Sequence, residues 1–226
     1  MGLAKEIVRL EGRIRAHYNV DPTVPGNERK AWVYNNFFDH AFLRTVWTNF
    51  HQVAPGVYRS NQPPHGRLAR IKARGINTVL TLRGASDTAH YLTELQSCEE
   101  LGLTLHATSM QARATATQEE LLNLIAVFRR IERPFVMHCK SGADRAGLAS
   151  AIWLMVMEGE PVERARRMLS PRYLHIRNSH VGILDHMLDV YAERNARSPL
   201  LFEDWVRNEY DRPAIQAGFK GWSLLG

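Results

Sequence analysis

The chain has 226 residues, 45% of them apolar, so it can bury a sizeable core but is too short for two full domains. Its formal net charge of +6 and its pI of about 9.6 favour acidic partners such as phosphate esters or anionic lipid surfaces. It contains no zinc-finger spacing, aromatic RNA-binding motif or long basic run, so we expect no nucleic-acid partner.

The two cysteines, Cys98 and Cys139, exclude a disulfide scaffold and favour a reducing compartment. The N-terminal sequence MGLAKEIVRLEGRIR is charged throughout and lacks the apolar stretch of a secretory signal. The longest apolar run, residues 146–157, is too short to span a bilayer. We therefore expect a soluble, cytoplasmic protein.

The first predicted element is an amphipathic helix over residues 3–16, with apolar side chains at steps of three and four. This helix would pack on the rest of the chain or on a partner, and its basic residues leave peripheral membrane contact as an alternative. A loop at 21–26 follows, rich in Pro and Gly. The aromatic-rich stretch 28–48 predicts a second helix. We expect residues 1–50 to form an N-terminal helical extension.

From about residue 50 the pattern alternates between strands and helices. His51–Arg59 predicts a strand or hairpin interrupted by Pro55-Gly56, and Thr117 with Glu120 forms a capping box that begins a helix. The other predicted elements are helix 64–74, strand 76–82, helix 91–101, strand 103–110, helix 118–131, strand 135–138 and helix 145–158. This order predicts an α/β fold with a central, mostly parallel sheet flanked by helices.

The remainder of the chain predicts helices only, at 161–169, 178–194 and 202–210. We expect one domain over residues 51–195 and a C-terminal helical extension over residues 196–226 that packs on it.

The segment from His138 to Gly147, with sequence HCKSGADRAG, carries the chemistry. A buried strand leads into a tight loop, and the loop opens a helix, where free N–H groups and the helix dipole favour an anion. Such donors around Cys139 would favour the nucleophilic thiolate. Arg145 could return to the loop and hold two oxygens of a phosphoryl group. The alternative is an inert buried cysteine followed by an arginine that caps the helix.

At these residues the sequence resembles the protein tyrosine phosphatase superfamily, whose signature is His-Cys-x5-Arg. The resemblance extends to VAPGVYRSNQP at residues 53–63 and GINTVLTLR at residues 75–83, and it covers roughly residues 50–190. The branch that it resembles most is the atypical, bacterial-type dual-specificity phosphatases. The signature is specific for the superfamily and its chemistry but not for the substrate.

The resemblance implies that Cys139 attacks phosphorus and that Arg145 binds the phosphate, without a metal or other cofactor. The loop amides would complete the phosphate cradle, which makes Lys140, Ser141, Gly142 and Ala143 substrate-binding residues. The substrate would be a phosphorylated protein, an inositol phosphate or a phospholipid. Lys140 and Arg113 favour a highly anionic substrate, although either could be an ordinary solvated side chain.

The sequence departs from the family where the general acid is expected. Relatives carry an aspartate on a loop before the cysteine, but the matching residues 106–117 contain no acidic residue. Asp144, next to Arg145, is the replacement that we predict as the third catalytic residue. The alternative is that Asp144 pairs with a cation or caps the helix. Asp87, after the strand that ends at Arg83, is a second candidate.

A second departure is Ala146, where relatives carry a Ser or Thr whose hydroxyl stabilises the leaving thiolate. We expect slower breakdown of the intermediate, or a substitute donor such as Ser141. This keeps open a phosphate-binding pseudophosphatase that recognises phosphorylated partners. A rhodanese-like sulfurtransferase is a further alternative, although its cysteine loop lacks the Cys-x5-Arg register. A reversible disulfide between Cys98 and Cys139 is a third open point, against a plain buried Cys98.

Overall fold

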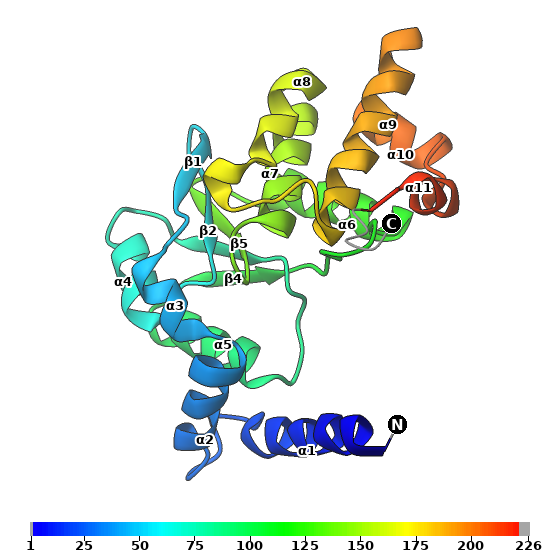
Figure 1. Cartoon of the computed structure of the whole chain (residues 1–226). Helices are drawn as coiled ribbons and strands as arrows, with labels where there is room; N and C mark the ends of the chain where they lie inside the picture. Colours follow the sequence, from blue (N-terminus) through cyan, green and yellow to red (C-terminus); the bar gives the residue numbers. More distant parts are fainter. Residues whose placement is uncertain (1, 222–226) are drawn as a thin grey trace. The chain divides into compact units, whose positions relative to one another are not determined.

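The computed structural model describes residues 2–221 (Figure 1). Met1 and residues 222–226, which fall in the predicted N- and C-terminal extensions, lie outside the described residues. The chain forms two compact units that alternate along the sequence. The first unit is Met1–Thr48, Pro63–Asn77 and Ala85–Leu105, and the second is Asn49–Gln62, Thr78–Gly84 and His106–Gly226. The three-part division expected from the sequence stays a prediction.

The first unit is helical. Its elements are α1 (Gly2–Tyr18), α2 (Glu28–Val33), the π-helix η1 (Tyr34–Phe38), α3 (Ala41–Val46), α4 (His65–Lys72) and α5 (Ala89–Glu100). The single helix predicted over 28–48 is therefore wrong. His40 adopts a left-handed conformation with φ of 57°, which a continuous right-handed helix does not allow, and α3 begins only after it.

The sequence predicts that helix α1 packs on the rest of the chain, on a partner or on a membrane surface, and its apolar face is exposed in the first unit. Ile7, Leu10 and Ile14 are 58%, 59% and 42% exposed. The small core of this unit lies further along the chain, where Tyr34 and Phe38 stack at 5.9 Å around the buried Ala31.

The central sheet has five strands in the order β1-β2-β5-β3-β4. They are β1 (His51–Ala54), β2 (Val57–Asn61), β3 (Thr78–Thr81), β4 (Thr104–Ala107) and β5 (Phe135–Cys139). Strands β1 and β2 form the antiparallel hairpin predicted at Pro55-Gly56, whereas β2 and β3 both run parallel to β5. The predicted α/β fold with a mostly parallel sheet is confirmed.

Strand β5 lies in the middle of the sheet, and all of its residues are buried. Its apolar run, Phe135–Met137, is typical of a parallel strand covered on both faces. The parallel register places Asn61 of β2 opposite Cys139 of β5. The ends of both strands therefore reach the same edge of the sheet, where the loop 140–143 begins.

The helices of the second unit are α6 (Gln118–Arg130), α7 (Asp144–Met157), α8 (Val162–Ala165), α9 (Ile183–Arg197), α10 (Phe202–Asn208) and α11 (Arg212–Gly218). Helix α7 contacts β1, β2 and β5, and α6 and α10 pack against it. The capping box is confirmed, because Thr117 Oγ1 accepts from the Glu120 amide at 3.0 Å while Glu120 Oε2 accepts from the Thr117 amide at 2.7 Å. Helix α11 was not predicted. It is short, and it buries only Ile215.

Candidate active site

Cys139 is the last residue of β5 and is only 1% exposed. The loop of residues 140–143 follows it, and α7 begins at Asp144. This is the strand, loop and helix order predicted from the sequence. A phosphoryl group beside the Cys139 sulfur would face the N-terminus of α7, where unsatisfied amides and the helix dipole favour an anion.

Gly142 allows the loop to lie directly against the end of β2. Its φ is +75°, and a Cβ atom there would lie 2.6 Å from the Asn61 nitrogen and 2.7 Å from the Ser60 oxygen. Both are backbone atoms of a central strand, so they cannot move aside at low cost. The path of the loop therefore requires glycine at this position, for its conformation and for its size.

We expect Gly142→Ala to lower the free energy of unfolding by about 3 kcal/mol, since a left-handed alanine and an overpacked contact both cost energy. Gly159→Ala is the matched control, because Gly159 has φ of +68° but nothing within 4 Å of the added Cβ. That control should lose only about 1 kcal/mol. Urea unfolding of both variants measures the difference, and equal losses would show that the contact with β2 is unimportant.

Arg59 contacts the loop after Cys139, although nothing in the sequence analysis singled it out. Its side chain is completely buried in β2, and its Nη2 donates to the carbonyl oxygens of Gly142 at 2.6 Å and Ala143 at 3.0 Å. Burial lowers the pKa of Arg59 to about 10, partly opposed by the charge of Cys139, so the guanidinium stays protonated at neutral pH. Arg59 thus holds the loop by its carbonyls.

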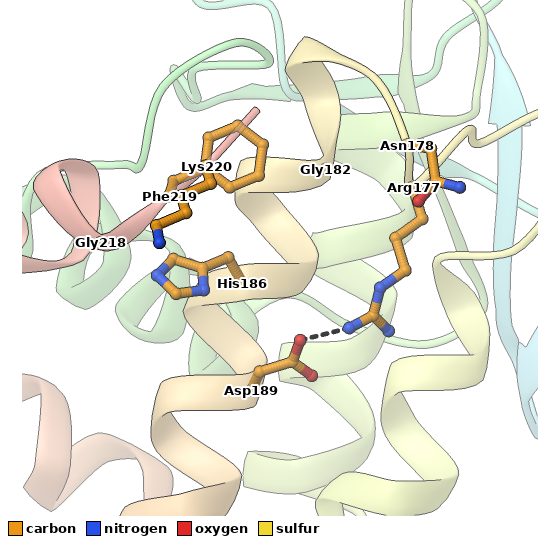
Figure 2. Close-up of a pocket in the computed structure, with 8 residues that line it drawn as sticks. All are labelled: Arg177, Asn178, Gly182, His186, Asp189, Gly218, Phe219 and Lys220. Carbon is orange, nitrogen blue, oxygen red and sulfur yellow. Dashed lines mark hydrogen bonds and ion pairs between the residues drawn. The ribbon is translucent and has the colours of Figure 1, made fainter. Parts of the chain in front are cut away.

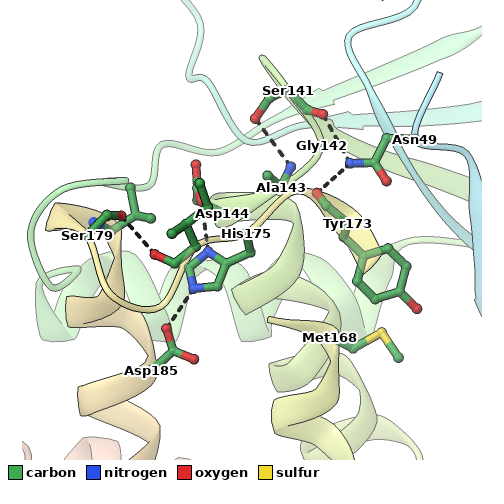
Figure 3. A network of polar contacts seen from close by, with 12 residues as sticks. Asn49, Ser141, Gly142, Ala143, Asp144, Met168, Tyr173, His175, Ser179 and Asp185 are labelled. Atoms are coloured by element: carbon green, nitrogen blue, oxygen red, sulfur yellow. Dashed lines mark hydrogen bonds and ion pairs between the residues drawn. The ribbon is translucent and has the colours of Figure 1, made fainter. Parts of the chain in front are cut away.

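This contact orients the loop amides. In a trans peptide the C=O and the following N–H point in opposite directions. With the carbonyls of Gly142 and Ala143 turned toward Arg59, the amides of Ala143 and Asp144 point away from it. Asn49 braces the loop too, because its Nδ2 donates to the carbonyl of Ser141 at 3.2 Å (Figure 3).

Asp144 is half-buried and begins a chain of three hydrogen-bonded side chains (Figure 3). His175 Nδ1 lies 2.8 Å from Asp144 Oδ1, and His175 Nε2 lies 2.6 Å from Asp185 Oδ2. His175 is completely buried, and Asp185 is 6% exposed. Burial alone would lower the pKa of His175, but its hydrogen bonds to Asp144 and Asp185 and their charges outweigh burial and raise the pKa to about 9. His175 is therefore an imidazolium at neutral pH, and it donates both protons.

The sequence left open whether Asp144 is a general acid or the partner of a cation. The structure gives it a cation partner, His175. Nothing in the sequence pointed to His175, which lies 31 residues after Asp144, or to Asp185 in α9.

The other predicted site residues differ in their burial and in their hydrogen-bond partners. Lys140 is half-buried in the loop, whereas the neighbouring Ser141 is exposed and its Oγ accepts from the Ala143 amide at 3.3 Å. Arg145 lies in the first turn of α7, half-buried, and its Nε is buried without a hydrogen-bond partner. Arg113 is exposed in the segment before α6, and no hydrogen bond or ion pair joins it to another described residue.

The remaining alternatives concern Asp87, Ala146 and Cys98. Asp87 is exposed and belongs to the first unit. Ala146 is completely buried, so no side-chain hydroxyl follows Arg145. Neither cysteine is in a disulfide, and burial together with the charges of Glu94 and Glu99 raises the pKa of Cys98 to about 12. Cys98 is thus held as an unreactive thiol.

A family model described as a DSP-PTPase phosphatase fused to NAD+ kinase matches residues 48–180, which is more than half of the chain. This chain belongs to that family. It is a member of the atypical dual-specificity phosphatase branch of the protein tyrosine phosphatase superfamily, as the Cys-x5-Arg loop indicated. The match includes the hairpin of β1 and β2, the loop of residues 140–143, and His175.

Among curated proteins, the chain is similar to the dual specificity protein phosphatase TpbA of Pseudomonas aeruginosa. The two are 28% identical over 113 residues, which are 49% of this chain and 48% of TpbA. The match thus spans about half the length of this relative.

Solved structures share the fold. A mutant form of Tk-PTP is 21% identical, with a TM-score of 0.51, covering 66% of this chain and 97% of that one. A DUF442 protein of Shewanella putrefaciens CN-32 is 15% identical, with a TM-score of 0.51, covering 69% and 95% of the two chains.

Proposed function

We propose that this phosphatase-family chain hydrolyses phosphate monoesters through a cysteinyl-phosphate intermediate on Cys139. The observation that carries the proposal is the brace that Arg59 forms on the loop after Cys139. This contact points the Ala143 and Asp144 amides away from Arg59. Amides that bind phosphate oxygens must be oriented in this way. Family membership and the similarity to TpbA support the same reaction.

In the first step the Cys139 thiolate attacks phosphorus, and the bond from phosphorus to the ester oxygen breaks. The electron pair of that bond goes to the leaving oxygen, which takes a proton that Asp144 relays from the His175 imidazolium. Arg145 and the loop amides bind the phosphoryl oxygens as charge develops on them. His175 and Asp185 act as positioning residues, because they fix the Asp144 carboxyl and keep a proton next to it.

In the second step a water molecule attacks the phosphorus of the cysteinyl phosphate. Asp144 takes one proton from the water, the sulfur–phosphorus bond breaks, and the products are inorganic phosphate and the Cys139 thiolate. Ala146 offers no hydroxyl to this leaving thiolate, so this step is the slower of the two. The intermediate should therefore accumulate during turnover.

The experiment is a steady-state and rapid-quench study of the described reaction. Phosphate release is measured with p-nitrophenyl phosphate, a phosphotyrosine peptide, a phosphothreonine peptide and an inositol phosphate. We expect a burst of p-nitrophenol followed by slower phosphate release, together with ³²P labelling of the protein when the reaction is quenched. Absence of both turnover and labelling on every substrate would reject the proposal.

Ala146 favours one alternative function, a pseudophosphatase that binds phosphorylated partners without hydrolysing them. The same experiment distinguishes the two functions. A pseudophosphatase would bind the phosphotyrosine peptide but release no phosphate from any substrate.

The partners of the protein and its contact with membranes stay proposals. A phosphorylated protein, inositol phosphate or lipid would be the partner, and the exposed apolar residues of α1, Ile7, Leu10 and Ile14, support peripheral membrane contact. None of the helices within residues 2–221 has both the length and the apolarity needed to cross a bilayer. The cytoplasmic location expected from the sequence stays a prediction.

A further inference from the structure

The second unit contains a cavity of about 660 Å³ whose lining is dominated by arginines. This arginine cavity is lined by Arg164, Arg166, Arg167, Arg172 and Arg177, with Glu163 as the one acidic residue among them. The five guanidiniums and one carboxylate give the lining a charge of +4, which is five positive minus one negative. A cavity of this size fits a small organic or inorganic ligand.

The carboxylates nearby neutralise only part of this charge, and Arg164 pairs with Glu160 at 2.8 Å. Arg166 and Arg177 both pair with the single carboxylate of Asp189, and the second of these pairs is drawn in Figure 2. Arg167 and Arg172 are exposed, and neither forms an ion pair with any residue in the described part of the chain. Two guanidiniums are therefore available to an anion from outside. Burial, followed by the charges of Arg172 and Arg59, also lowers the pKa of the nearby His51, as a positive local field would.

The wall of the cavity is connected to the catalytic loop. Tyr173 and Met168 line the cavity, and both contact Arg59. The Arg59 guanidinium lies 4.0 Å from the centroid of the Tyr173 ring, and its Nη1 donates to the Met168 carbonyl at 2.7 Å. The same guanidinium holds the carbonyls of Gly142 and Ala143 through Nη2.

Asn49 forms a second connection, because its Nδ2 donates to the carbonyl of Tyr173 at 3.0 Å as well as to that of Ser141 (Figure 3). An anion that binds in the arginine cavity would therefore contact Met168 and Tyr173, whose contacts with Arg59 and Asn49 support the loop of residues 140–143.

We propose that the arginine cavity is a second binding site, distinct from the Cys139 loop, for a multiply charged phosphate anion. Planar guanidiniums bind phosphate oxygens in pairs, and Arg167 and Arg172 provide two of them. Leu174 and Ile176, which follow the lining residue Tyr173 in the chain, are 55% and 63% exposed. The anion is thus a soluble polyphosphate or the headgroup of a phosphorylated lipid.

The test is calorimetric titration with pyrophosphate in the Cys139→Ser protein, so that no turnover intervenes. Two variants are built on this protein. One carries the double change Arg167→Ala and Arg172→Ala, and the other carries the single change Arg145→Met. The double change should weaken one binding event by about tenfold or more, whereas Arg145→Met should leave that event intact. The matched control replaces two exposed arginines elsewhere, Arg29→Ala with Arg130→Ala. Thermal unfolding checks that each variant is folded.

A second arm uses co-sedimentation with vesicles of phosphatidylcholine and phosphatidic acid. Pyrophosphate binding that depends on Arg167 and Arg172 assigns the site to a soluble anion. Vesicle binding that depends on them, without a pyrophosphate event, assigns it to a lipid headgroup. If the double change and its control behave alike with both probes, the proposal is wrong. Because neither arm requires turnover, the second site can hold even if the proposed hydrolysis fails.

Discussion

Cys139→Ser should reduce kcat for every phosphate ester by at least about 10⁴-fold, as the loss of a covalent nucleophile does in other enzymes. A serine hydroxyl is almost the same size as the thiol that it replaces, and Cys139 is nearly fully buried at the end of β5. The fold and the binding of inorganic phosphate should therefore remain. Phosphate release and isothermal titration with phosphate measure the two effects separately.

The chain supplies its own control in Cys98→Ser. Cys98 is also buried and free, but the high pKa of about 12 keeps it as a thiol. This variant should keep kcat within about twofold on the basis of folded protein, because an unionised thiol is no nucleophile. Turnover that survives in Cys139→Ser would place the nucleophile elsewhere.

The second large effect concerns the chain of Asp144, His175 and Asp185. Asp144→Asn should lower kcat/KM, which reports the first chemical step, by about 10²- to 10⁴-fold for alkyl phosphates, whose leaving oxygen needs a proton. The loss should be smaller for p-nitrophenyl phosphate, because p-nitrophenolate leaves without protonation. A uniform loss for both substrates would mean that Asp144 shapes the loop and does not transfer a proton.

The pH profile tests the positioning role of His175. Its pKa of about 9 predicts that kcat declines above that pH as the imidazolium loses its proton. Asp185→Asn removes one of the two carboxylates that hold this proton, so the decline should move to lower pH while KM changes little. His186→Gln is the control, because His186 packs against Phe219 and has no contact with Asp144. An unchanged profile in Asp185→Asn would overturn this role.

The same proton makes stability depend on pH. The pKa of His175 rises from an ordinary value of 6.5 to about 9 on folding, so the folded state holds the proton more tightly. The resulting stabilisation is complete below about pH 6.5, and it is lost as the pH rises through about 9. Urea unfolding of wild type across this range, compared with His175→Gln, isolates the contribution.

Structural features that depend on interactions within a few residues could be predicted from the sequence. The hairpin at Pro55-Gly56 and the capping box of Thr117 and Glu120 depend on local turn and cap chemistry, and the structure has both. The order of strand, loop and helix around Cys139 follows from an apolar run, a glycine and a helix pattern in direct succession. The signature of residues 138–145 was enough to place the chain in its family.

The side chains that support the loop of residues 140–143 from distant parts of the sequence could be identified only from the tertiary structure. Arg59 reaches carbonyls 83 and 84 residues away, and His175 reaches Asp144 across 31 residues. No periodicity or spacing encodes such contacts, because they depend on how strands pair and how the segment after α7 folds back. The helix predicted over 28–48 is interrupted because local propensity favours helix there, whereas His40 adopts a left-handed conformation with φ of 57° that separates η1 from α3.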